Sequence, residues 1–169
     1  MVYGNICHGA RRGVLVGGGR DNIIDNNIFV NCGTGVHIDQ RGLGWAKNYF
    51  NGETPTLFDR MKEVKGDQPP YTGKYPELKT LLTDEPVLAK GNKVIHNINV
   101  GDNFLDLTDG LTEHTPYLEI KDNFTEGDPG FADAAKHDYR LKPESPAFAK
   151  GYKELPFEKM GRNGPSVLK

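Results

Sequence analysis

A 22-residue repeat near the N-terminus constrains the fold of this chain more than any other feature. The step Asn5-Ile6 recurs as Asn27-Ile28, and Gly-Val-Leu-Val at 13–16 recurs as Gly-Val-His-Ile at 35–38, each 22 residues later. Short runs of β-branched and aliphatic residues, bounded by Gly, Asn or Asp, lie between these steps, as is typical of strands. Two features that share one fixed period indicate a repeat architecture.

Two or three short strands within 22 residues, with no helix between them, fit one coil of a parallel β-helix, whose strands stack about 4.8 Å apart. The Asn-apolar step returns at Asn97 and Asn123, and stacked asparagines can hydrogen-bond from coil to coil as a ladder. An antiparallel β-sandwich is also rich in turns and short strands, but it does not explain the shared register. The repeat therefore predicts an all-β solenoid.

Composition agrees with this prediction and argues against several functions. The 169 residues include 21 Gly and 11 Pro, which disfavours a helical bundle. Lys and Arg number 21 against 23 Asp and Glu, so a basic face for nucleic acid is not indicated. No apolar stretch reaches the roughly 20 residues that span a bilayer. We expect neither nucleic acid nor membrane as a partner.

The period is interrupted over about 43–89, which divides one domain (1–169) into coils at about 1–42 and 90–127. Thr54-Pro55 is typical of a helix start, so a short amphipathic helix is expected near 55–64. Tyr75-Pro76 predicts a second helix, with the leucines at 78, 81 and 82 as its buried side. The tail, about 128–169, is expected to be an extended cap that covers the last open coil.

The same register bears on the two cysteines. Cys7 lies opposite Phe29, which displaces Cys32 by three residues, or about 10 Å, along the neighbouring coil. Because a disulfide needs Cα atoms within roughly 7 Å, both thiols are expected to be free. Asn123 begins a glycosylation sequon, but its place in the repeat favours a ladder position instead.

Several stretches resemble bacterial right-handed parallel β-helix proteins of the pectate-lyase-like superfamily. They are Gly-Gly-Gly-Arg-Asp-Asn at 17–22, Asn-Ile-Phe at 27–29 and His-Ile-Asp at 37–39. Tyr-Pro-Glu-Leu at 75–78, Lys-Gly-Asn at 90–92, Asp-Pro-Gly-Phe at 128–131, Tyr-Arg-Leu at 139–141 and Ser-Pro-Ala at 145–147 are similar to the C-terminal part of a carbohydrate-active branch. That branch includes fucosidase- and xylanase-type β-helix glycoside hydrolases.

The resemblance implies a right-handed parallel β-helix fragment from the C-terminal part of a longer, extracytoplasmic (secreted or periplasmic) protein. It also implies a polysaccharide or oligosaccharide as partner and a glycoside hydrolase as activity, with the fragment alone inactive. An exposed first coil would in addition allow end-to-end self-association with a second copy.

The alternation of side chains along a strand predicts where the candidate catalytic and binding residues lie. If Val36 and Ile38 enter the core, His37 and Asp39 point outward together, about 6.8 Å apart. The 22-residue register then puts Gly17 beneath Asp39, and a glycine patch leaves room for a ligand to approach the backbone.

From this arrangement we expect a carbohydrate groove on the outer face. Asp39 paired with Asp21 or Asp106 is the candidate acid/base or nucleophile pair; carboxylates about 5 Å apart suit retention and a wider spacing suits inversion. The expected substrate-binding residues are His37, Arg20, Arg41, Trp45, Gly17, Gly18 and Gly19. Trp45 either stacks on a sugar or anchors the core.

Two other functions remain open. A polysaccharide lyase would use Ca²⁺ held by acidic turns, with Arg20, Arg41 or Lys47 as the base, whereas the hydrolase needs no cofactor or metal. A non-catalytic carbohydrate-binding or structural β-solenoid would bind glycans without cleaving them.

Overall fold

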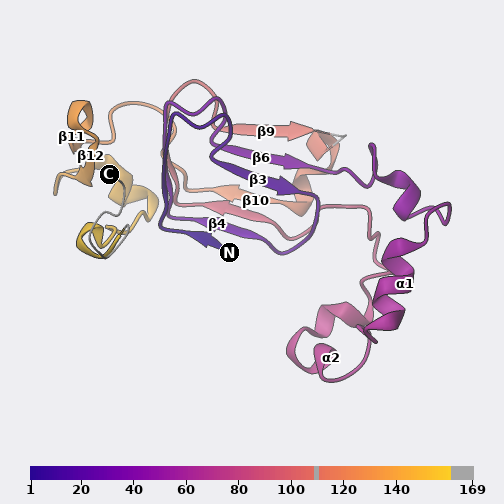
Figure 1. Ribbon diagram of the computed structural model, residues 1–169. Helices are drawn as coiled ribbons and strands as arrows, with labels where there is room; N and C mark the ends of the chain where they lie inside the picture. The colour runs from indigo at the N-terminus through magenta and orange to yellow at the C-terminus, as the bar shows by residue number, and fades with distance from the viewer. Residues whose placement is uncertain (109–110, 161–169) are drawn as a thin grey trace, which may run out of the picture.

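The computed structural model describes residues 1–108 and 111–160, and most of the regular structure is parallel β-sheet (Figure 1). The first sheet has the order β1 (Val2–Tyr3), β4 (Ile23–Asp25), β7 (Lys93–Ile95), β10 (Glu119–Lys121). The second has the order β2 (Ile6–His8), β5 (Ile28–Val30), β8 (Ile98–Val100). The third has the order β3 (Val14–Gly17), β6 (Val36–Asp39), β9 (Leu105–Thr108). The chain visits the three sheets in turn, so its strands stack in a solenoid-like arrangement compatible with a β-helix.

The 22-residue register predicted from the sequence is confirmed. Val14 pairs with Val36, and Val36 pairs with Leu105 of the next coil, all in parallel. In the second sheet, Cys7 pairs with Phe29. The third coil keeps the same columns although the insertion separates it from the second coil in sequence.

An asparagine ladder connects the turns between the first and second sheets. The side-chain Oδ1 of Asn27 accepts hydrogen bonds from the backbone N–H and Nδ2 of Asn5, both at 3.0 Å. Asn97 accepts from Asn27 in the same way, and Asn123 accepts from Asn97. Asn123 is therefore a ladder position, as predicted. Positive φ at Asn26 and His96 turns the chain just before the ladder, a conformation that Asn adopts at little cost.

The interior of the stack contains one apolar cluster drawn from all three sheets. Ile24, Phe29, Val36 and Val94 are fully buried there. Cys7 and Cys32 lie at this cluster as free thiols. The predicted spacing of about 10 Å is wrong, because the Sγ of Cys32 lies 3.4 Å from the carbonyl oxygen of Cys7. The alternation of side chains along each strand thus produces the core that the repeat predicted.

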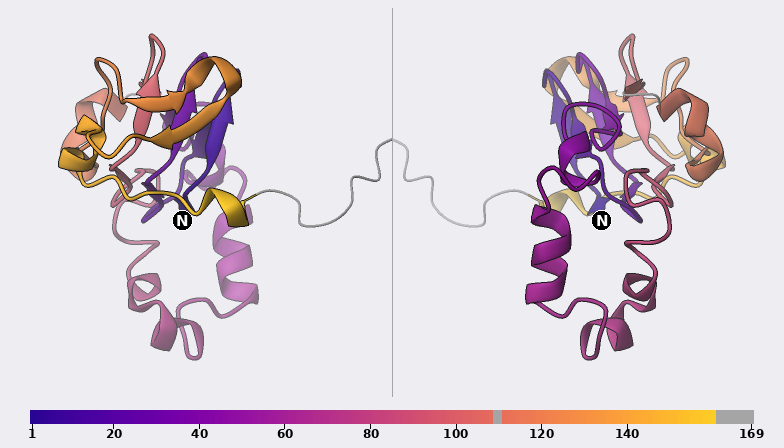
Figure 2. Two further views of the ribbon diagram at one scale, coloured as in Figure 1. Left: turned by 90° about the vertical axis from the view of Figure 1, so that its left-hand side faces the viewer. Right: turned by 90° about the vertical axis from the view of Figure 1, so that its right-hand side faces the viewer.

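The tail packs along the side of the stack, where it contacts residues of the second, third and last coils. Its hairpin of β11 (Phe131–Asp133) and β12 (Asp138–Leu141) packs on the outer face of the second sheet, against Ile28, Val30 and Ile98. Figure 2 shows the hairpin lying across these strands. The backbone N–H of Lys153 also donates to Asn26 Oδ1 at 2.6 Å. The tail packs on this face because β5 is apolar on both faces, so its outward side chains are buried only when another segment covers them.

The remaining elements of the tail are short 3₁₀ helices. They are η4 (Ala134–Lys136), η5 (Pro146–Lys150) and η6 (Phe157–Lys159). Tyr139 and Leu141 are buried in the outer cluster and Phe148 packs against it, so all three serve as anchors.

The insertion contains the first predicted helix but not the second. Helix α1 spans Thr56–Glu63, where a helix was expected near 55–64, and it follows η1 (Lys47–Tyr49). In place of a second amphipathic helix stand one turn of α2 (Tyr71–Lys74) and the 3₁₀ turn η2 (Pro76–Lys79). Tyr75 separates them, and the leucines at 78, 81 and 82 are only half-buried.

One further 3₁₀ segment, η3 (Leu111–Tyr117), connects the third and first sheets after β9. Among the described residues, no helix has the length and apolar character needed to cross a membrane.

Candidate functional site

The outer face of β6 carries the polar residues on which the sequence analysis focused. Val36 and Ile38 are buried in the core cluster, so His37 and Asp39 project from the opposite face of the strand. On either side, the register places Leu15 and Asp106 beside His37, and Gly17 and Thr108 beside Asp39.

His37 lies between two carboxylates from adjacent coils. Its Nδ1 is 2.7 Å from Asp106 Oδ2, and its Nε2 is 3.8 Å from Asp39 Oδ2. The imidazole is buried, whereas the side chain of Asp106 is 38% exposed and that of Asp39 is 10% exposed. Asp106 thus connects a buried histidine to solvent.

Asp39 is also held by Arg41 in a bidentate ion pair. Arg41 Nε donates to Asp39 Oδ1 at 2.9 Å, and Nη2 donates to Oδ2 at 2.8 Å. These bonds hold the pKa of Asp39 below its usual range, because they outweigh the opposing effect of burial. Asp39 is therefore an anion that orients both His37 and Arg41, and it is not a proton donor at neutral pH.

The glycine patch makes room for the arginine. A Cβ placed on Gly17 would collide with the guanidinium of Arg41, so only glycine lets the guanidinium lie across this strand end. Gly18 and Gly19 continue the bare backbone, both with positive φ. The sequence predicted that a ligand would approach the backbone of these glycines. In the structure, the side chain of Arg41 lies against Gly17 instead.

Beyond Arg41 the surface opens into a hollow of about 410 Å³, here called the Trp45 hollow. Its floor and walls come from the glycine patch, from Arg41 and from the start of the insertion. Trp45 is 71% exposed, and its ring centroid lies 5.4 Å from Arg41 Cζ. This exposure excludes a core role for Trp45.

The insertion supplies residues that the sequence analysis did not identify as part of this site. Tyr49, Phe50 and Arg60 line the Trp45 hollow, together with Leu57 and Val87. Arg60 also forms an exposed ion pair with Glu63, with Nη1 and Oε2 3.0 Å apart. The sequence contains one feature that indicates these lining residues: aromatic residues cluster at 45–50, directly after the strand that carries His37 and Asp39.

Arg20 and Asp21 belong to a different part of the surface. Both line a hollow of about 520 Å³ against Tyr75 and Leu78. Arg20 Nη2 bonds Asp84 Oδ2 at 2.7 Å. Among residues 1–108 and 111–160, no hydrogen bond or ion pair connects Asp21 to Asp39, so the structure joins Asp39 with Asp106 through His37 instead.

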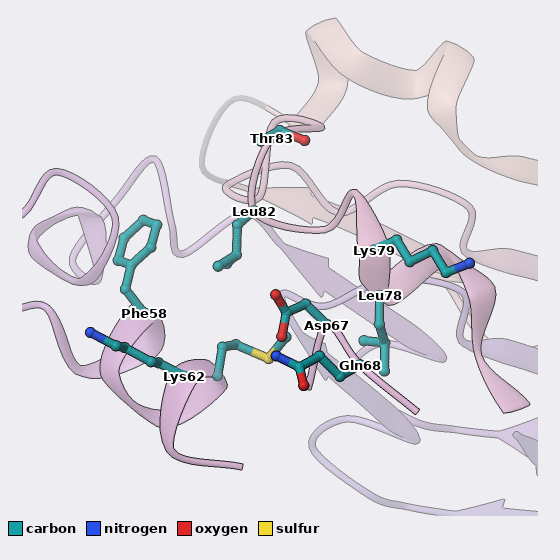
Figure 3. Close-up of a pocket in the computed structure, with 9 residues that line it drawn as sticks. Phe58, Lys62, Asp67, Gln68, Leu78, Lys79, Leu82 and Thr83 are labelled. Atoms are coloured by element: carbon teal, nitrogen blue, oxygen red, sulfur yellow. The ribbon is translucent and has the colours of Figure 1, made fainter. Parts of the chain in front are cut away.

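Figure 3 shows a third hollow, of about 340 Å³, inside the insertion. Phe58 of α1 and Leu82 point into it, and Asp67 and Gln68 lie on its other side (Figure 3). The space separates α1 from the returning segment of the insertion, and it has no connection to the polar residues of β6.

Comparisons with known proteins do not extend these findings, because no family model, no curated protein and no solved structure matches the chain. Within the described part of the chain, no three His, Cys, Asp or Glu side chains gather as metal ligands would.

Proposed function

We propose that the Trp45 hollow binds a sugar unit of an oligosaccharide or polysaccharide, within a right-handed parallel β-helix related to the pectate-lyase-like superfamily. The observation that carries the proposal is the exposure of Trp45, 71%, at the rim of the hollow. A large exposed aromatic ring beside a hollow typically marks a binding surface.

The chemistry of the hollow suits a saccharide. The apolar face of a pyranose stacks on an indole ring, while sugar hydroxyls take hydrogen bonds from a planar guanidinium. The ion pair with Asp39 fixes Arg41, and Arg41 in turn lies against Trp45. Because both partners are held before the ligand arrives, little ordering entropy is lost on binding.

Because Trp45 is the single tryptophan of the chain, its fluorescence tests the proposal directly. Titration with xylo-oligosaccharides and with fucosylated oligosaccharides is expected to shift the emission saturably for at least one of the two classes. By calorimetry, Trp45→Ala is expected to weaken binding about tenfold, the loss of roughly 1.4 kcal/mol.

The matched control is Tyr75→Ala, which removes an aromatic ring of comparable exposure, 51%, from the neighbouring hollow. It is expected to leave the affinity unchanged. Equal affinities for all three proteins, or no saturable shift with either sugar class, would refute the proposal.

A second candidate is glycoside hydrolysis, as the C-terminal part of an extracytoplasmic enzyme, and the two carboxylates that flank His37 favour it. Asp39 and Asp106 lie on adjacent coils, and the register offsets them by two residues along the strands. That offset puts their Cα atoms roughly 8 Å apart, from a strand spacing of about 4.8 Å and a rise of about 3.3 Å per residue.

In this mechanism Asp39 stays ionised and positions His37, and Asp106 is the carboxylate nearer to solvent. Asp106→Asn and His37→Gln are expected to lower turnover at least a hundredfold in a protein shown to cleave a glycan. Asp102→Asn, which changes an exposed acid of the same coil, is the control. Release of an unsaturated product would instead assign a lyase, and unaltered turnover in Asp106→Asn would exclude this pair.

A further inference from the structure

Two cysteines lie close together where the first coil meets the second. Cys7 is the middle residue of β2, and Cys32 lies two residues after the end of β5. The Sγ of Cys32 is 3.4 Å from the carbonyl oxygen of Cys7. Cys32 is buried in the interior apolar cluster and Cys7 packs against that cluster, so both thiols face the same space.

A turn after each of the two strands explains this proximity. Gly9 and Asn31 both have positive φ, 64° and 50°, so the chain changes direction just after β2 and just after β5. Beyond the turn the two coils stay in contact, because the N–H of Gly33 donates to Ala10 O at 2.9 Å. The bend therefore brings the two cysteines closer than a straight strand of the same length would.

The positions of the two residues suit a covalent bond between them. A disulfide needs Cα atoms within roughly 7 Å of each other. The carbonyl oxygen of Cys7 and the Sγ of Cys32 are each two bonds from their own Cα. A contact of 3.4 Å between these two atoms is therefore compatible with that limit.

Only weak contacts hold the two sulfur atoms of the reduced protein in place. The Sγ of Cys32 also lies 3.7 Å from the carbonyl oxygen of Val30, and the Sγ of Cys7 lies 3.7 Å from that of Gly13. A thiol is a weak hydrogen-bond donor, so rotation about the Cα–Cβ bonds gives up little and can turn each sulfur toward the other. Burial raises the pKa of Cys7, and the further contribution of Cys32 to this shift agrees with their proximity.

We propose that Cys7 and Cys32 form a modification site, at which a low-molecular-weight disulfide oxidises the two thiols to one bond between neighbouring coils. The reaction begins at Cys7, which is half-buried, whereas Cys32 is 7% exposed. The thiolate of Cys7 attacks one sulfur of the small disulfide and displaces the other sulfur as a thiolate, which takes up a proton.

Cys32 completes the exchange. Its thiol loses a proton and attacks the Cys7 sulfur of the mixed disulfide, which displaces the second small thiol. Two protein thiols and one small disulfide thus become one protein disulfide and two small thiols, so electrons and protons balance.

The bond closes a loop from residue 7 to residue 32 and holds β2 against the turn that follows β5. Closing a loop of this length restricts the unfolded chain more than the folded one. The oxidised chain is therefore expected to unfold about 5 °C or more above the reduced chain.

The experiment treats the whole chain with oxidised glutathione at about pH 8.5, near the ordinary pKa of a thiol. The treatment is applied to the native protein and, separately, during refolding from urea, where both thiols are accessible. We expect a monomer that is lighter by two hydrogen atoms, a 7–32 crosslink in peptide mapping, and a gain in Tm that dithiothreitol reverses.

The matched control is Cys7→Ser/His8→Cys, which keeps two thiols but moves one to the outer face of β2, because neighbouring residues of a strand point to opposite faces. It is expected to form no 8–32 crosslink and to gain no Tm. Thiols of the parent that stay reduced in both treatments, a glutathione adduct that persists on Cys7, or an equally abundant crosslink in the control would overturn the proposal.

Discussion

Removal of one inner rung of the asparagine ladder is the perturbation whose cost the structure fixes best. The Oδ1 of Asn97 accepts two hydrogen bonds from Asn27, and its two Nδ2 hydrogens are shared among three acceptors: the carbonyl oxygens of Ile24 and Ile95 and Asn123 Oδ1. Asn97 is fully buried. Asn97→Ala leaves the backbone N–H of Asn27 and two carbonyls without this partner.

The expected loss for Asn97→Ala is about 3–5 kcal/mol of unfolding free energy, since each buried bond contributes roughly 1 kcal/mol and a buried unsatisfied donor costs about 1–3 kcal/mol. The matched control is Asn5→Ala at the exposed end of the same ladder, which loses two side-chain bonds and is expected to cost about 1 kcal/mol or less. Urea unfolding, read from the midpoint at constant m value, measures both. Equal costs at the two positions would refute the reasoning, because the ladder would then not be a continuous buried network.

Three further results are expected. Gly17→Ala places a methyl group against the guanidinium of Arg41, so sugar affinity at the Trp45 hollow is expected to fall several-fold with little change in Tm, as calorimetry and thermal unfolding would show. The hydrogen bonds from Arg41 lower the pKa of Asp39 in the folded protein. The stabilisation from this ion pair is therefore fully present above the unfolded pKa of about 3.9, and it is lost as pH falls through the folded pKa. The difference in unfolding free energy between the parent and Asp39→Asn, from urea midpoints, is expected to shrink below about pH 4. Burial, with a smaller contribution from the neighbouring Cys32, raises the pKa of the Cys7 thiol, so alkylation of Cys7 in the native protein at pH 7 is expected to be slow compared with the unfolded protein.

The columns of the stack were predictable because alternation along a strand and a fixed repeat length determine them together. The pairs Leu15 with His37 and Gly17 with Asp39 follow from counting residues, and they are confirmed. The placement of Asp106 beside His37 required the register to survive the insertion, and it does. The exposure of Trp45 could not be decided from the sequence, because an indole serves equally as a core anchor and as a stacking surface.

The face of the stack on which the tail packs was not predicted, although a signal was present. Strand β5 reads Ile-Phe-Val and is buried at all three positions. A continuous apolar run indicates a strand covered on both faces, and the tail is the segment that supplies the second cover. The second helix is replaced by the 3₁₀ turn η2, because its leucines are only half-buried and a short helix depends on the packing of its apolar face.

The residues of the insertion that line the Trp45 hollow could not be assigned from sequence. Tyr49, Phe50 and Arg60 follow no repeat, so no register relates them to the coils. Their position depends on how the insertion leaves and rejoins the stack, through contacts such as the hydrogen bond from the Ala89 N–H to the buried Gln40 Oε1 at 3.1 Å. Contacts between segments far apart in sequence leave no local pattern.

Disulfide formation between neighbouring coils is the most direct test that side chains of successive coils share columns, on which the site depends. Adjacent parallel strands place paired Cα atoms about 4.8 Å apart, within the range of roughly 4.4–6.8 Å for a disulfide. In Leu15→Cys/His37→Cys, we predict a 15–37 crosslink in the oxidised protein, identified by peptide mapping. In Leu15→Cys/Asp39→Cys, whose positions are two residues out of register, we predict none. A crosslink in the second variant, or in neither, would contradict the stacked register.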